Sequence, residues 1–132
     1  MKVRRIIGNR ILSAELGQIV GQEGEYKVLR IDNPEDIVKF LKINNIHSWD
    51  IEDIHYARLY APIWFLYKND EVIGVYAERD GRLLGRDASP IKDPEAVRIF
   101  KKIISKKITA ERTFSDEEKE EMFNWLDALR ES

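Results

Sequence analysis

The two histidines of the chain are the first residues whose type could carry out chemistry. His47 and His55 flank an acidic run formed by Asp50, Glu52 and Asp53. Imidazoles and carboxylates bind divalent metals or act as general acids and bases. A helical metal pair, however, needs a spacing of about three or four residues, whereas these histidines are eight residues apart. We therefore interpret the run as a solvated helix start, where acids favour the positive end of the helix dipole, and predict no metal site.

Other catalytic patterns are also missing. No serine lies in a G-x-S-x-G elbow, and the chain has no cysteine to act as a thiolate nucleophile or zinc ligand. Gly17, Gly21 and Gly24 fit neither the Walker pattern nor the dinucleotide fingerprint. We predict no catalytic residue, no cofactor and a non-enzymatic protein; an acid-rich metal site around His47 and His55 is the weakest of our hypotheses.

The charged residues follow a pattern along the chain. Residues 1–12 are basic without any acid, residues 98–112 contain a single acid, and residues 115–131 contain seven acids. Two basic surfaces could contact a phosphate backbone; the candidate nucleic-acid-binding residues are Arg4, Arg5, Arg98, Lys101, Lys102 and Lys106. In the alternative, which the net charge of -2 favours, the basic and acidic helices pair with each other or are merely solvated. The acidic segment has the same two interpretations, a solvated face or a partner-binding surface that includes Glu117, Glu120 and Glu121.

Aromatic residues gather in the middle of the chain. Strand alternation over 63–68 places Trp64 and Leu66 on one face and Phe65 and Tyr67 on the other. Either helices cover both faces, or one face is an interface, because Trp and Tyr are favoured at interface centres. For the second case we name Trp64, Tyr67 and Tyr76 as partner-binding residues, and an exposed aromatic face would favour a homodimer.

The elements that must position these residues follow from periodicity and turn signals. The 132 residues match one domain at roughly 100–200 residues per domain, and the 43% of hydrophobic residues can form a core. Alternation predicts strands, and capping residues and helical spacing predict helices. The strands are 26–31, 63–68, 72–78 and 82–85, and the helices are 34–43, 50–60, 94–105 and 115–131. We predict one α+β domain over 1–132, with an antiparallel meander of at least three strands packed with about four helices.

Two motifs stand out in the segment 57–91, Ala61-Pro62-Ile63-Trp64 and Asp87-Ala88-Ser89-Pro90-Ile91. Through them the segment resembles a module of phage proteins and of PcfJ-like proteins of mobile elements, in which a "GPLY"-type strand is followed by a "D-x-P-I" ending. Ala61 replaces the usual glycine, and Leu84 stands where the family has an earlier aspartate. The resemblance implies a phage or mobile-element setting rather than a particular chemistry, and no functional residue is carried over from it.

These observations favour a non-enzymatic, phage or mobile-element-type protein that binds a host or viral protein as an adaptor or inhibitor. The alternative is a nucleic-acid-binding module that uses the basic helix 95–105 and the N-terminal arginines. The longest apolar run, 63–67, is too short for a membrane span of about 20 residues. We expect a location in the cytoplasm, of the host if the protein is viral. The 35% of charged residues is common both in thermostable proteins and in small, very soluble ones.

Overall fold

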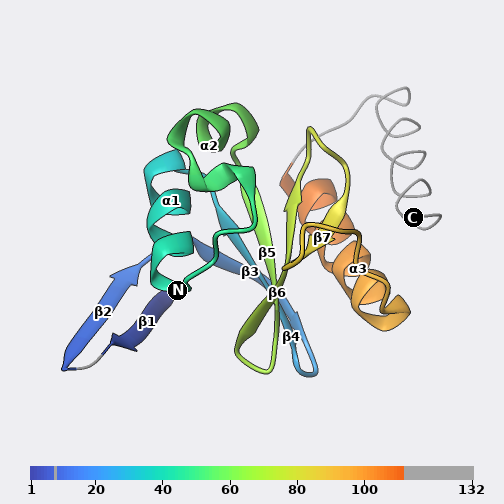
Figure 1. The fold of residues 1–132 in the computed structure, drawn as a ribbon. Helices are drawn as coiled ribbons and strands as arrows, with labels where there is room; N and C mark the ends of the chain where they lie inside the picture. Colours follow the sequence, from blue (N-terminus) through green and yellow to red (C-terminus); the bar gives the residue numbers. More distant parts are fainter. Residues whose placement is uncertain (8, 112–132) are drawn as a thin grey trace.

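The computed structural model of the chain describes residues 1–7 and 9–111 (Figure 1). Its elements follow in the order β1 (Lys2–Ile7), β2 (Arg10–Glu15), β3 (Gln18–Glu23), β4 (Tyr26–Ile31), α1 (Pro34–Ile43), the 3-10 helix η1 (Asp50–Glu52), α2 (Ile54–Tyr60), β5 (Ile63–Lys68), β6 (Glu71–Ala77), β7 (Leu83–Gly85) and α3 (Pro94–Glu111). Within these residues, no helix is long and apolar enough to cross a membrane.

Strands β3 to β7 form one antiparallel sheet in which sequence neighbours are also spatial neighbours. The predicted meander is therefore confirmed, and β4 extends it by pairing with β5 across the intervening helices. The turn between β5 and β6 is tight, because Asn69 and Asp70 both have positive φ values, of 50° and 64°. Asn and Asp tolerate this left-handed backbone better than most residues, so the sequence signal has a physical basis.

Helices cover both faces of the sheet (Figure 1). Helices α1 and α2 and the 3-10 helix pack on one face against Phe65 and Tyr67. Helix α3 packs on the other face against Trp64 and Tyr76. The predicted alternation along β5 is confirmed, and the core consists of two layers, one on each side of the sheet.

The helix predicted over 50–60 is broken at Asp53. This residue has an extended backbone, with φ -82° and ψ 129°, and its side chain accepts a hydrogen bond from the backbone N–H of His55 at 2.9 Å. A residue that caps a helix cannot also lie in its interior, so the short helix η1 ends there and α2 begins. By contrast, α1 begins as predicted, with Asn33 as its cap and Pro34 in its first turn.

Helix α3 is longer than predicted: it continues past Ser105 to Glu111, the last residue that the structure describes. The prediction ended it early because Lys107 would fall on the apolar side, but residues 105–111 contain no proline or glycine to stop a helix. The predicted helix 115–131 lies outside the described residues, so the described part of the chain holds three α-helices where about four were predicted.

Strands β1 and β2 form a separate two-stranded ribbon that extends away from the main sheet (Figure 1). Its base is anchored in the core by Val3 and by Leu16, which follows β2. There the N-terminal ammonium group donates a hydrogen bond to the carbonyl of Gly17 at 2.9 Å and forms an ion pair with Glu15. The glycine-rich start of the chain, predicted as short strands or a loop, thus consists of three strands.

Candidate functional site

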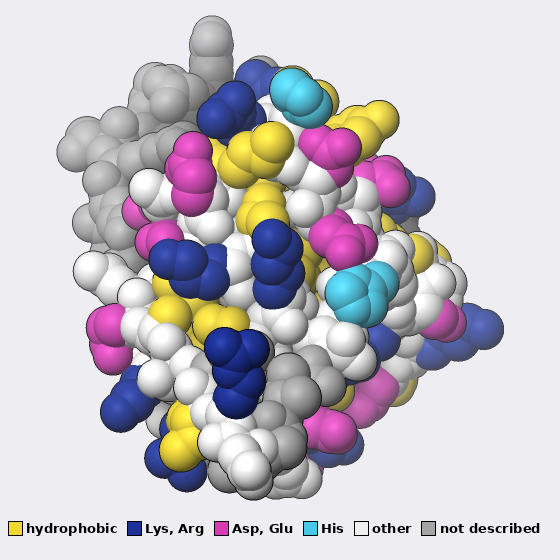
Figure 2. Space-filling view, turned by 60° about the vertical axis from the view of Figure 1, so that its left-hand side comes forward, with side chains coloured by type: hydrophobic (Ala, Val, Ile, Leu, Met, Phe, Trp, Pro, Cys, Tyr) yellow, Lys and Arg dark blue, Asp and Glu magenta, His cyan; other side chains and the backbone are white. Residues whose placement is uncertain are grey.

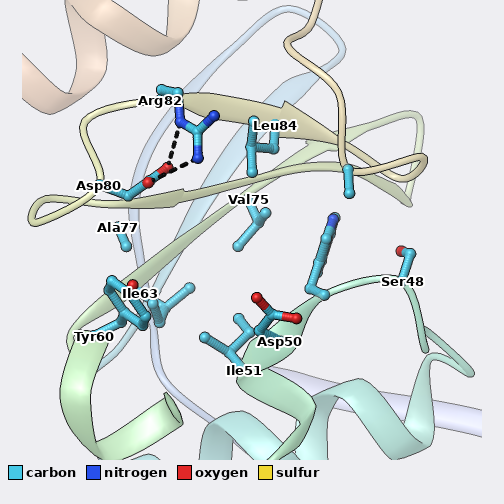
Figure 3. Close-up of a pocket in the computed structure, with 12 residues that line it drawn as sticks. Ser48, Asp50, Ile51, Tyr60, Ile63, Val75, Ala77, Asp80, Arg82 and Leu84 are labelled. Atoms are coloured by element: carbon cyan, nitrogen blue, oxygen red, sulfur yellow. Dashed lines mark hydrogen bonds and ion pairs between the residues drawn. The ribbon is translucent and has the colours of Figure 1, made fainter.

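A pocket of about 260 Å³ lies between helices η1 and α2 on one side and strands β6 and β7 on the other (Figure 3). Its apolar lining includes Ile63 from β5 and Val75 from β6. Three charged side chains also line it: Asp50, Asp80 and Arg82. The pocket thus combines an apolar interior with charged groups, as small binding sites commonly do.

Trp49 fixes one wall of this pocket. Its side chain is buried, and its indole Nε1–H donates a hydrogen bond of 2.9 Å to the carbonyl of Gly85 at the end of β7. The ring also packs against Phe65, with 6.1 Å between centroids. The segment before η1 is therefore tied to the far side of the pocket, which holds the two sides together.

The charges in the pocket are arranged asymmetrically. Arg82 donates two hydrogen bonds to Asp80, from Nε and from Nη2, each 3.0 Å long. These hydrogen bonds, and the charge of Asp80, raise the pKa of the Arg82 guanidinium. Asp50 instead points into the pocket (Figure 3), and within the described part of the chain no hydrogen bond or ion pair holds its carboxylate.

An apolar stripe on the outside of α2 leads away from the pocket. Tyr56 and Leu59 are 46% and 48% exposed, and Tyr60, in the next position along the chain, lines the pocket. Positions i, i+3 and i+4 share one face of a helix, so these three side chains form a continuous row. We call Tyr56, Leu59 and Tyr60 the α2 stripe.

No family model, curated protein or solved structure matches this chain. The geometry of the chain is therefore the basis for assigning a function, and the resemblance of segment 57–91 to phage and PcfJ-like proteins stays a prediction.

The aromatic residues predicted to bind a partner do not form an exposed face. Trp64, Tyr67 and Tyr76 are only 2%, 3% and 1% exposed, because helices cover the sheet on both sides. Trp64 packs against Tyr76 and lies under the guanidinium of Arg30, at 5.3 Å from the ring centroid. The prediction of an exposed aromatic face was wrong, and the burial of these residues removes the basis for a homodimer through that face.

The acidic candidates Glu117, Glu120 and Glu121 lie outside the described residues.

The predicted nucleic-acid-binding residues fall on two separate parts of the molecule. Arg4 is exposed on β1, and Arg5 follows it in the same strand, with its side chain outside the described part. On α3, Arg98 and Lys102 are exposed, Lys101 is half-buried, and the side chain of Lys106 is not described. The ribbon lies on the α1 side of the sheet and α3 on the opposite side (Figure 1), so they do not form one surface.

Both basic segments also lie among other kinds of side chain. Lys102 on α3 forms an ion pair of 3.0 Å with Glu23 on β3. On the face that Figure 2 brings forward, basic, acidic and hydrophobic side chains are interspersed. This mixture weakens the prediction of a broad electrostatic surface for a phosphate backbone.

The histidines do not form a metal site in the described residues. His47 is held by Glu52, with 2.6 Å between Nδ1 and Oε1, and by Asn45, with 3.0 Å between Nε2 and Oδ1. Across residues 1–7 and 9–111, no group of three or more His, Cys, Asp or Glu side chains is placed to hold a metal ion.

Sequence reasoning missed the pocket and the stripe. Asp50 and Arg82 are far apart in the sequence, so no local motif indicates that they line the same pocket. The spacing of Tyr56, Leu59 and Tyr60 was a usable signal, because three large apolar side chains share one helical face. Within α2, Ala57 is fully buried, whereas Tyr56 is 46% exposed.

Proposed function

We propose that this chain is a non-enzymatic protein-binding module that contacts its partner through the α2 stripe and the adjoining pocket. The observation that carries the proposal is the continuity of these two features: exposed Tyr56 and Leu59 lead through Tyr60 into an apolar pocket with charged groups. Aromatic residues next to a pocket are typical of interface centres, where one or two side chains of the partner supply most of the binding energy.

The size of the pocket supports a side chain as its occupant. Sites for drug-sized ligands usually measure roughly 300–1,000 Å³, and this pocket of about 260 Å³ is slightly smaller. A side chain presented by a protein surface needs less room, and the α2 stripe then contacts the surface around it.

The segment that resembles phage and PcfJ-like proteins contributes most of the residues of the pocket and the α2 stripe. Residues 57–91 include the end of α2, strands β5, β6 and β7, and the loop after β7. Under this proposal the chain is a phage or mobile-element-type protein, and its partner is a host or viral protein that it recruits or inhibits.

The test is an affinity pull-down from host lysate with the tagged full chain and two variants. We expect a partner that the unmodified chain captures after nuclease treatment to be lost with the double variant Tyr56→Ser/Leu59→Ser. The matched control is Ile11→Ser, which removes another exposed apolar side chain, 60% exposed, on the ribbon. Exposed substitutions change stability by only about 0.5 kcal/mol, so circular dichroism and Tm should stay the same. Equal capture by all three proteins would rule out the stripe as the contact.

A second candidate function is nucleic-acid binding through the ribbon. The observation that favours it is the projection of β1 and β2 away from the sheet, together with the absence of any acid in residues 1–14. The major groove, about 12 Å wide, admits a two-stranded ribbon.

Binding to a fluorescent DNA duplex would then weaken as the salt concentration rises. The variant Arg4→Ala/Arg10→Ala would make this salt dependence less steep, by the amount expected for the loss of about two phosphate contacts. The control Arg98→Ala/Lys102→Ala on α3 should leave it unchanged; the opposite pattern, or no binding, would exclude the ribbon.

A further inference from the structure

The charges in the pocket described above do not balance. Asp50 and Asp80 contribute two negative charges, and Arg82 contributes one positive charge. Both short hydrogen bonds of Arg82 go to Asp80, so this pair neutralises itself. Asp50 is left as the uncompensated charge of the pocket.

The backbone around Asp50 is held in place on both sides. Trp49, before it, is anchored by its hydrogen bond to Gly85, and Ile51, after it, is buried. The carbonyl of Asp50 accepts a hydrogen bond of 3.0 Å from the backbone N–H of Asp53, which closes the 3-10 turn. The backbone of Asp50 is therefore fixed, and its exposed side chain points into the pocket toward the side lined by the Asp80–Arg82 pair (Figure 3). A backbone that is already ordered reduces the entropy that binding of a ligand must offset.

The walls of the pocket suit the stem of a long cationic side chain. Ile63 and Val75 are buried aliphatic residues that can pack against methylene groups. Tyr60 and Trp49 add aromatic surface, which attracts cations. An anionic ligand would instead meet the free carboxylate of Asp50 and find the guanidinium of Arg82 already paired.

We infer that the pocket accepts an arginine or lysine side chain of the protein partner, with Asp50 as its counter-ion. This inference rests on the proposed function, which it deepens by giving the chemistry of the partner: a basic residue on a surface that packs against Tyr56 and Leu59. The self-contained Asp80–Arg82 pair forms the opposite wall.

Small probes test the inference without knowledge of the partner. The full chain, labelled with ¹⁵N, is titrated at constant ionic strength with butylguanidinium, butylammonium, neutral butylurea and butyrate. The reporter is the indole N–H signal of Trp49, which lines the pocket and is hydrogen-bonded to Gly85. We expect both cations to shift this signal saturably, butylurea to bind more weakly and butyrate to have no effect.

Variants separate the role of Asp50 from general electrostatics. Asp50→Asn should weaken the binding of both cations about tenfold, as expected for the loss of a charge-assisted contact. Asp50→Glu should retain part of the affinity, because it keeps the charge. The matched control is Glu71→Gln, which removes an exposed carboxylate at the opposite end of β6 from Ala77, a residue that lines the pocket. An unchanged Trp49 signal in each free variant shows that the pocket is intact.

Two outcomes would overturn the inference. If butyrate or butylurea binds as well as the cations, or if Asp50→Asn binds them unchanged, the pocket does not select cations, while the proposed protein-binding function stands. If no probe shifts the Trp49 signal, the inference also fails. The pull-down with Tyr56→Ser/Leu59→Ser then decides the proposed function separately, because it tests the stripe rather than the pocket.

Discussion

One carboxylate organises the loop between β7 and α3. Asp87 accepts hydrogen bonds from the hydroxyl of Ser89 at 2.6 Å and from the backbone N–H of the same residue at 3.2 Å. These bonds are stronger to the charged carboxylate than to the neutral acid, so they lower the pKa of Asp87. Ala88, between the two residues, has a φ of 64°, a conformation that alanine rarely adopts and that the surrounding hydrogen bonds must maintain.

We expect Ser89→Ala to raise the pKa of Asp87 toward the ordinary value of about 3.9. Because the folded-state pKa is lowered, the carboxylate stabilises the loop above the pKa of the unfolded chain, and this contribution disappears as the pH falls through the folded-state pKa. An NMR titration of the Asp87 carboxyl carbon measures the change. Ser48→Ala, at an exposed serine on the other side of the pocket, is the control. An unchanged Asp87 titration in Ser89→Ala would show that other groups lower its pKa.

At the scale of single residues, the sequence predicts which face of a strand a side chain lies on, but not whether that face is covered. Alternation placed Trp64 opposite Phe65 correctly, because a strand has a period of two. Whether Trp64 is exposed depends on α3, which packs on that face of the sheet. The prediction of an aromatic interface failed at this non-local step.

The packing of α3 on β3 depends on the absence of one side chain. A Cβ atom at Gly21 would lie 2.3 Å from Cγ2 of Ile103, a distance that real Cβ atoms do not show. Glycine at this position lets the helix approach the edge strand of the sheet, and Ile103 fills the space. Gly21 is thus required by a contact between two elements rather than by its own backbone conformation.

A double-mutant cycle tests this contact. Gly21→Ala alone should destabilise the fold by about 1–3 kcal/mol through overpacking, and Ile103→Ala alone by about 2–5 kcal/mol through a cavity. In the double variant the new methyl group occupies part of the space that Ile103 leaves. We therefore expect its loss to be smaller than the sum of the single losses by about 0.5–3 kcal/mol. Urea unfolding measures the three free energies, and additivity within error would contradict the contact.

At the scale of elements, local signals predicted the strands well and the helix ends less well. Strands β4 and β5 have the predicted bounds because alternation and turn residues act over a few positions. The break between η1 and α2 depends on Asp53, whose side chain can serve either as a helix cap or as one more acid in the first turn. The pocket could not be predicted, because it forms where η1 and α2 meet β6 and β7.

For the molecule as a whole, the sheet separates two apolar layers that share β5. Ile63, Phe65 and Tyr67 belong to the layer with α1 and α2, whereas Trp64 and Leu66 belong to the layer with α3. The same arrangement keeps the basic ribbon and the basic helix α3 apart. Any partner that contacts both would have to reach around the sheet, so the two basic segments are best treated as independent surfaces.

Each apolar layer contains a tyrosine whose ionisation opposes folding. Burial raises the pKa of Tyr67 in one layer and of Tyr76 in the other, and neighbouring acids add to both effects. Both hydroxyls stay protonated in the folded chain at a pH where they ionise in the unfolded chain. The stability that depends on them is fully present below the unfolded pKa of about 10 and is lost as the pH rises beyond it.

We therefore expect unfolding at alkaline pH, with the free energy of unfolding falling by about 1.4 kcal/mol per pH unit for each of the two groups above pH ~10. Tyr67→Phe and Tyr76→Phe should each reduce this slope by one group, whatever they do to stability at neutral pH. Tyr56→Phe is the control, because Tyr56 is 46% exposed on α2. Urea unfolding across the alkaline range gives the slopes, and absorbance of ionised tyrosine shows when the buried hydroxyls titrate. If Tyr67→Phe and Tyr76→Phe keep the full slope, the ionisation of these two tyrosines does not cause the alkaline loss of stability, and other groups do.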